Sequence, residues 1–104
     1  MHTSPTFRRE TIDSDPPGSL LDVTLIADVT GNGRPDIVIG GKAGAANLFW
    51  YENPTWECHA IASAPELEAG GVSLDITGNG LPDIVGKPYA PERHVDIWFN
   101  ESNG

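Results

Sequence analysis

One eleven-residue stretch occurs twice in this chain and constrains its fold more than any other feature. The copies run from Asp28 to Val38 and from Asp75 to Val85, and they differ only at their second and seventh positions. They lie 75 − 28 = 47 residues apart. A period of this length indicates tandem structural repeats, in which each repeat forms one supersecondary unit.

Each copy carries side-chain oxygens at its positions 1, 3, 5 and 9 and glycines at positions 4 and 6. Glycine permits a tight backbone curl with positive φ, which would bring these oxygens toward one point. Oxygen ligands suit Ca²⁺, which takes six to eight of them. No Glu stands at position 12, so the loop is not an EF-hand. The predicted ligands are Asp28, Thr30, Asn32, Asp36 and the carbonyl of Arg34, and in the second copy Asp75, Thr77, Asn79, Asp83 and the carbonyl of Leu81.

The loop resembles the calcium loop of the FG-GAP repeat (integrin α-chain-like, also called VCBS), in which Asp-x-Asp-Gly-Asp-Gly-x-Pro-Asp leads into an Ile-Val strand. The resemblance implies β-propeller blades, Ca²⁺ as cofactor and a preference for extracellular or cell-surface sites, although the residues themselves name no compartment. Both copies have Thr at position 3 and Asn at position 5. Each loop therefore offers two formal negative charges instead of four, which weakens Ca²⁺ binding. The alternative is a metal-free turn in which Thr and Asn bond to the backbone.

Apolar segments separated by short turns predict an all-β fold of two propeller blades around these loops. Residues 20–62 would form the first blade, and residues 70–100 a second blade that lacks its outer strand. We expect a lone strand at residues 7–12, whose sequence is similar to that of residues 56–61. Residues 1–6 before it are expected to be disordered, and residues 101–104 are expected to form a tail. The expected strands are 22–27, 35–41, 47–52 and 56–61, then 71–74, 82–85 and 95–99, with a turn at 42–46.

The lone strand and the incomplete blade suggest a permuted assembly. We expect residues 7–12 of one copy to complete the last blade of a neighbouring copy, because fewer than about three repeats are seldom stable and open sheet edges invite pairing. Two-blade chains close a symmetric ring as a homotrimer with six blades, which we favour, or as a tetramer with eight. The alternative is a piece excised from a longer propeller.

Aromatic side chains are the candidate ligand-binding residues. Trp98 aligns with Trp50 at an offset of 98 − 50 = 48, and flat rings stack on sugar faces. Propeller lectins, some of the FG-GAP type, bind sugars between blades, so the resemblance implies a carbohydrate ligand. Blade-to-blade packing is the alternative role for the paired tryptophans. The candidates are Trp50, Tyr51, Trp98, Tyr89 and Arg93.

The composition excludes several partners. A formal net charge of −9 repels phosphates and anionic membrane surfaces, so we expect no nucleic-acid partner. The sequence contains no long apolar run and no leader of the secretory type, so we expect no membrane insertion. The single cysteine, Cys58, permits no internal disulfide and no cluster of Cys and His ligands. The acidic surplus fits a halophilic protein or an ordinary acidic surface.

No catalytic signature stands out, and we expect a protein that is not an enzyme. The chain has no Gly-x-Ser-x-Gly and no phosphate loop, and we expect carboxylate pairs only within the two loops. His59 is interpreted as a partly buried polar group. The run from Leu48 to Pro54, followed by Trp56 and His59, also resembles the propeller part of certain sugar lyases and dehydratases. A fragment of such an enzyme and a purely structural assembly unit are therefore the alternatives to a binding module.

Overall fold

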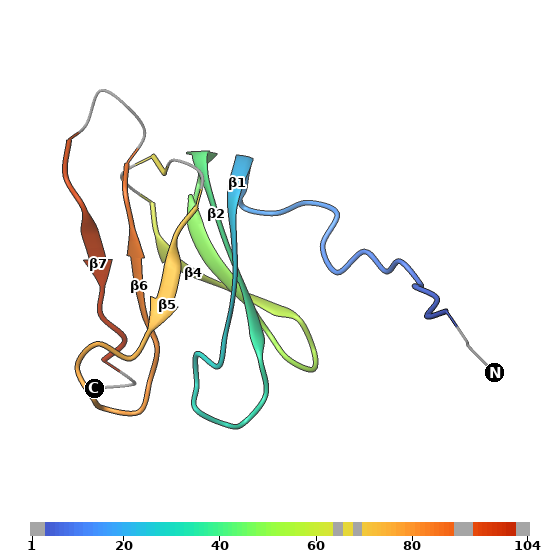
Figure 1. Cartoon of the computed structure of the whole chain (residues 1–104). Coiled ribbons are helices and arrows are strands. Elements are labelled where there is room, and N and C mark those ends of the chain that lie inside the picture. Colours follow the sequence, from blue (N-terminus) through green and yellow to red (C-terminus); the bar gives the residue numbers. More distant parts are fainter. Residues whose placement is uncertain (1–3, 64–65, 68–69, 89–92, 102–104) are drawn as a thin grey trace.

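The computed structural model describes residues 4–63, 66–67, 70–88 and 93–101 and contains two antiparallel sheets. The first sheet has the order β1-β2-β3-β4, and the second sheet has the order β5-β6-β7 (Figure 1). No helix among these residues is long and apolar enough to cross a membrane. The all-β prediction is confirmed. The strands are β1 (Gly18–Ala27), β2 (Asp36–Gly44), β3 (Leu48–Glu52), β4 (Glu57–Ala62), β5 (Val72–Leu74), β6 (Asp83–Gly86) and β7 (Asp96–Trp98).

The first two strands are longer than the sequence predicted. β1 begins at Gly18, and β2 continues to Gly44, through residues where a turn was expected. These ends pair, with Gly18 opposite Gly44 and Ser19 opposite Ala43. A side chain at Gly18 would lie 2.5 Å from the carbonyl oxygen of Ala46, so only glycine allows this close approach. The small residues that suggested a turn therefore extend a tightly packed strand pair.

The N-terminal segment lies outside both sheets and extends away from them (Figure 1). Phe7 is 94% exposed, and the residues from 7 to 12 form no strand within the single chain. The predicted strand would need another copy as its partner, so it stays a prediction. Closer to β1, the Tyr51 hydroxyl donates a 2.6 Å hydrogen bond to Asp13 Oδ2, which holds the segment against the first sheet.

The two sheets share one apolar core. Val23, Val38 and Leu48 of the first sheet pack with Leu67 and with Ile84 of the second sheet. Two hydrogen bonds support this packing. The N–H of Leu67, in the connection between the sheets, donates to the Gly41 carbonyl of β2 (2.9 Å), and the Ser73 hydroxyl of β5 donates to the Ile26 carbonyl of β1 (3.2 Å). Figure 1 shows β5 beside β1, and these two strands contact each other across the sheets.

The register of the second sheet corrects the predicted alignment of the tryptophans. Ile37 pairs with Tyr51 in the first sheet, and Ile84, which lies 84 − 37 = 47 residues later, pairs with Trp98. Trp98 is therefore the counterpart of Tyr51 at the offset of 47, and Ile97 is the counterpart of Trp50. The predicted offset of 48 was wrong by one residue. Because side chains alternate between the faces of a strand, this one-residue difference places Trp50 and Trp98 on opposite faces of their sheets.

Candidate functional site

The first loop, residues 28–36, is organised by the carboxylate of Asp28. Its Oδ1 accepts hydrogen bonds from the backbone N–H groups of Gly31 (3.0 Å) and Asn32 (3.1 Å), and its Oδ2 accepts one from Gly33 (2.8 Å). Gly31 and Gly33 have φ angles of 77° and 87°, which glycine adopts without strain. Asn32 Oδ1 accepts the N–H of Arg34 at 2.9 Å. The Asn side chain thus bonds to the backbone, as the metal-free alternative expects.

The second loop, residues 75–83, repeats this arrangement atom for atom. Asp75 Oδ1 accepts the N–H groups of Gly78 (2.8 Å) and Asn79 (3.2 Å), and Asp75 Oδ2 accepts that of Gly80 (2.9 Å). Asn79 Oδ1 accepts the N–H of Leu81 at 3.0 Å. The repeated sequence therefore specifies one local structure in two different surroundings.

The last carboxylate of each loop is buried and joins three segments of its sheet. Asp36 accepts the N–H of Val29 through Oδ2 and the N–H of Asn53, just past β3, through Oδ1, both at 2.9 Å. Asp83 accepts the N–H groups of Ile76 (2.9 Å) and Asn100 (2.8 Å) in the same way. Both Asp residues are 0% exposed. They fix the start of the loop against the end of the third strand in each repeat.

The hydrogen bond from the backbone N–H of Asn100, assisted by those from Ile76 and Thr77, lowers the pKa of Asp83 below its ordinary value, although desolvation opposes the shift. A lowered pKa in the folded state means that the ionised carboxylate stabilises the fold above the pKa of the unfolded chain. This contribution is lost as the pH falls through the folded-state pKa.

The donor atoms of both loops suit a hard cation. Carboxylate, amide and hydroxyl oxygens are the ligands that Ca²⁺ takes, and ionised carboxylates have about four lone-pair sites, so accepted N–H bonds do not use all of them. Two charges per loop favour modest affinity. The loops are also closed by their own hydrogen bonds, so their backbone shape does not depend on a metal. The residues present therefore fit Ca²⁺ as an added ligand rather than as the organiser of the loop.

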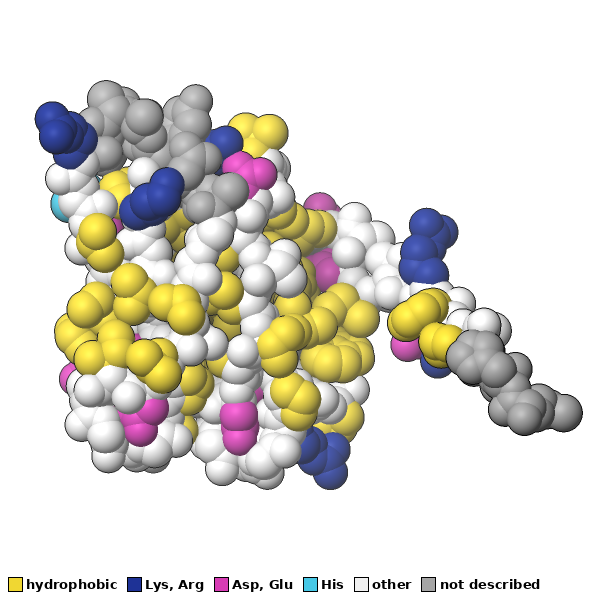
Figure 2. All heavy atoms as spheres, viewed as in Figure 1, with side chains coloured by type: hydrophobic (Ala, Val, Ile, Leu, Met, Phe, Trp, Pro, Cys, Tyr) yellow, Lys and Arg dark blue, Asp and Glu magenta, His cyan; other side chains and the backbone are white. Residues whose placement is uncertain are grey.

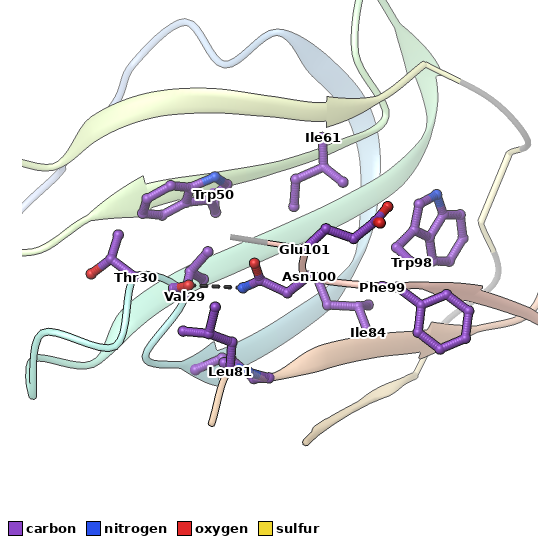
Figure 3. A pocket seen from close by; sticks show the side chains of 12 residues that line it. Val29, Thr30, Trp50, Ile61, Leu81, Ile84, Trp98, Phe99, Asn100 and Glu101 are labelled. Atoms are coloured by element: carbon purple, nitrogen blue, oxygen red, sulfur yellow. Dashed lines mark hydrogen bonds between the residues drawn. The ribbon is translucent and has the colours of Figure 1, made fainter. Parts of the chain in front are cut away.

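A cavity of about 760 Å³ lies between the two sheets, next to both loops. Trp50 and Ile61 line it from the first sheet, and Ile84 and Trp98 line it from the second (Figure 3). Asn100 lies among these side chains and donates a 2.8 Å hydrogen bond to the Val29 carbonyl, so it connects the end of the second sheet to the first loop (Figure 3). The one-residue difference in register explains why both tryptophans reach the same cavity, each from the face of its sheet that looks toward the other sheet.

The other predicted ligand-binding residues lie elsewhere. Tyr51 is buried on the opposite face of β3 from Trp50, where its ring packs edge to face on Phe49 with a centroid distance of 5.7 Å. Burial and its bond to Asp13 raise the pKa of Tyr51 well above its usual range. Arg93 is exposed and is not among the residues that line the cavity. Tyr89 lies outside the described residues.

The structure also assembles a group that the sequence interpretation missed. Glu52, Glu57 and His59 bring one ligand atom each within 4.8 Å of one another. The expectation that carboxylate pairs occur only within the loops was therefore wrong. The signal was available in the hairpin itself, because residues flanking the four-residue turn from Asn53 to Trp56 face each other across an antiparallel pair.

The repeated sheets, each with an aspartate-based loop between its first two strands, define a tandem-repeat all-β protein. A family model described as FG-GAP-like repeat matches residues 28–86, which is more than half of the chain. The chain belongs to this family, and the predicted resemblance is confirmed. Neither the comparison with curated proteins nor the comparison with solved structures gives a significant match.

The buried carboxylate of the first loop gives a direct test of how the repeat is held. Asp36→Asn replaces one of two acceptor oxygens with an amide donor, so one of the N–H groups of Val29 and Asn53 loses its acceptor. We expect the free energy of unfolding to fall by about 1–3 kcal/mol, the cost of a buried unsatisfied polar group. Urea unfolding in EDTA measures this without any metal contribution. The matched control is Asp15→Asn at an exposed position, and equal losses in the two variants would contradict the role of Asp36.

Proposed function

We propose that the chain is a non-enzymatic, calcium-binding β-propeller module that assembles with further copies of itself and presents a carbohydrate-binding groove. The single observation that carries the proposal is the face that the second sheet leaves open. Val72, Leu74 and Ile97 are 52%, 61% and 41% exposed, and they form part of an apolar surface (Figure 2). Large exposed apolar surfaces are typical of interaction sites.

This open face repeats a face that the first sheet buries. The counterparts of the exposed residues at the offset of 47 are Leu25, Ala27 and Trp50, all of which pack in or against the core between the two sheets. The second sheet therefore offers a third sheet apolar side chains at the same positions that the first sheet uses to pack on the second. A further blade of the same family fits this surface, and a second copy of the chain supplies one.

Such contacts are head-to-tail, because the open face of the second sheet in one copy would pack on a different surface, that of the first sheet, in the next copy. Head-to-tail contacts form rings when the rotation closes and filaments when it does not. With two blades per chain, three copies give six blades and four give eight. We favour the trimer, in which residues 7–12 of each copy pair with the free edge of β7 in the next.

Calcium binding is supported by the two equivalent loops. Asp28, Thr30, Asn32 and Asp36 would hold one ion with the carbonyl of Arg34, and Asp75, Thr77, Asn79, Asp83 and the carbonyl of Leu81 would hold the second. When bound, Ca²⁺ supplies positive charge that offsets the carboxylates of each loop. The chain's own hydrogen bonds already set the loop shape, so the ion adds stability to a formed site.

The cavity between the two sheets is the proposed ligand site. Two indole rings and neighbouring aliphatic groups supply flat apolar surface, and Thr30, Asn100 and Glu101 are polar residues in the lining of the same cavity. Sugars present this combination of apolar ring faces and hydroxyl groups. Trp50 and Trp98 are the residues that we propose contact the ligand, whereas Tyr51 supports the first sheet from its other face.

Calcium should stabilise the folded chain. We expect added Ca²⁺ to raise the melting temperature and EDTA to lower it, because a ligand at 100 times its Kd stabilises the folded state by about 2.7 kcal/mol per site. Differential scanning calorimetry measures the shift. In the double variant Asp28→Asn with Asp75→Asn, the calcium-induced shift should disappear, whereas Asp15→Asn should keep it. A wild-type melting temperature that is indifferent to both reagents at several salt concentrations would refute metal binding.

Self-assembly should appear as a solution mass of three or four chains of 11.1 kDa. Leu74→Glu places a charge on the open face of the second sheet, so we expect it to shift the mass toward that of one chain. Multi-angle light scattering provides the measurement. Ala45→Glu adds the same charge in the exposed turn after β2 and should leave the mass unchanged. A wild-type species with the mass of one chain that unfolds cooperatively would overturn the assembly.

Carbohydrate binding should depend on the two tryptophans of the groove. We expect Trp50→Ala and Trp98→Ala to weaken binding to a glycan found on an array by roughly tenfold or more, which corresponds to about 1.4 kcal/mol. Trp56→Ala, at a tryptophan that does not line the cavity, is the control. Light scattering and circular dichroism verify that each variant keeps its assembly and fold. If the wild type binds no glycan on the array, carbohydrate binding is refuted and the purely structural assembly unit is the interpretation that remains.

A further inference from the structure

The β3–β4 hairpin carries a compact set of metal-ligating side chains at its turn. Glu52 is the last residue of β3, Glu57 is the first residue of β4, and the two are direct partners in the register. His59 pairs with Trp50 one step further along the same face of the sheet. His59 Nε2 and Glu52 Oε1 are 2.9 Å apart. One imidazole and two carboxylates thus converge from two neighbouring strands.

The direct opposition of two glutamates is unfavourable without a cation. Like charges that face each other across an antiparallel pair destabilise the sheet. Within the described part of the chain, neither Glu52 nor Glu57 forms an ion pair with a Lys or Arg, and the His59 imidazole beside Glu52 offsets the charge only when it is protonated. The surrounding chain also carries a formal net charge of −9, so it does not offset the pair. A bound divalent cation would remove this repulsion.

The imidazole is held in a defined orientation. The ring of His59 stacks on the indole of Trp50 with centroids 4.5 Å apart and an interplanar angle of 27°. This stacking leaves the Nε2 edge directed at Glu52. A ligand side chain that is already held in place lowers the entropic cost of binding a metal ion.

The spacing of the ligand atoms is close to that of a metal site. Ligands about 2.0–2.2 Å from a tetrahedral Zn²⁺ lie roughly 3.3–3.6 Å from one another. The observed separation of 2.9 Å between His59 Nε2 and Glu52 Oε1 has to open by only a few tenths of an ångström, and Glu57 can follow because its side chain is exposed. The mixed nitrogen and oxygen set favours a borderline transition ion over Ca²⁺, which takes oxygen ligands.

We propose that Glu52, Glu57 and His59 form a Zn²⁺-binding site, separate from the two aspartate-based loops. Three protein ligands leave one coordination position of a tetrahedral ion open. The site adjoins the cavity between the sheets, because Trp50 both stacks on His59 and lines that cavity. None of these three residues belongs to the calcium loops or to the open face of the second sheet, so Zn²⁺ binding here is independent of calcium binding and of assembly.

Isothermal titration calorimetry of the full chain with Zn²⁺, in excess Ca²⁺ to fill the loops, tests the proposal. We expect saturable binding of one Zn²⁺ per chain. Glu57→Gln and His59→Gln should each raise the Kd at least tenfold, since even the loss of a supporting partner in a metal site costs 10–100-fold. With Co²⁺ as the probe, the wild type should show a visible absorption band that His59→Gln abolishes.

His94→Gln is the matched control, because His94 also faces a carboxylate, that of Asp96, at 3.3 Å. It should keep the wild-type Kd. Glu57 is exposed at the hairpin end, so Glu57→Gln is expected to fold normally, and circular dichroism verifies this. The absence of saturable Zn²⁺ binding in the presence of Ca²⁺ would overturn the proposal. So would a Kd that His94→Gln raises as much as His59→Gln, or one that Glu57→Gln leaves unchanged.

Discussion

Two buried carboxylates, Asp36 and Asp83, hold the loop of each repeat to the end of its third strand. Each accepts one backbone N–H from the start of its loop and one from the residue just past the third strand. The connection spans 17 residues of sequence in both repeats and fixes where the third strand lies relative to the loop. Buried donors without acceptors are costly, so these bonds define the register of each sheet as well as stabilising it.

That register determines which side chains meet between the sheets. Once Asn53 and Asn100 are tied to equivalent carboxylates, Tyr51 and Trp98 become equivalent, and Trp50 corresponds to Ile97. Trp50 then faces the second sheet, and Trp98 faces the first. A shift of one residue would reverse both faces, and the two indoles would no longer share a cavity. The polar loop chemistry thus controls the apolar surface on which the proposed ligand site is built.

The sequence predicted the features that arise from local chemistry. The doubled loop, its glycine turns and seven of the eight predicted strands could be read from patterns of residues close together in the chain, and the family from the resemblance of the loop to a known repeat. The tryptophan alignment failed because matching aromatic types is a weaker constraint than the hydrogen bonds to Asp83. The cluster of Glu52, Glu57 and His59 was missed because His59 was considered alone rather than as the neighbour of its cross-strand partners. The early start of β1 at Gly18 was missed because small residues resemble a turn.

The proposed calcium loops and the proposed assembly would be coupled by charge. A chain with a formal net charge of −9 repels its own copies, and two bound Ca²⁺ ions would reduce this to −9 + 4 = −5. The proposed head-to-tail contact would bring together apolar faces of the sheets, so the repulsion between copies would come from the surrounding acidic groups and would be screened by salt. Both loops follow the innermost strand of their sheets, β1 and β5, which pack side by side. Calcium ions bound in these loops would reduce the repulsion between acidic groups at the place where neighbouring blades approach most closely.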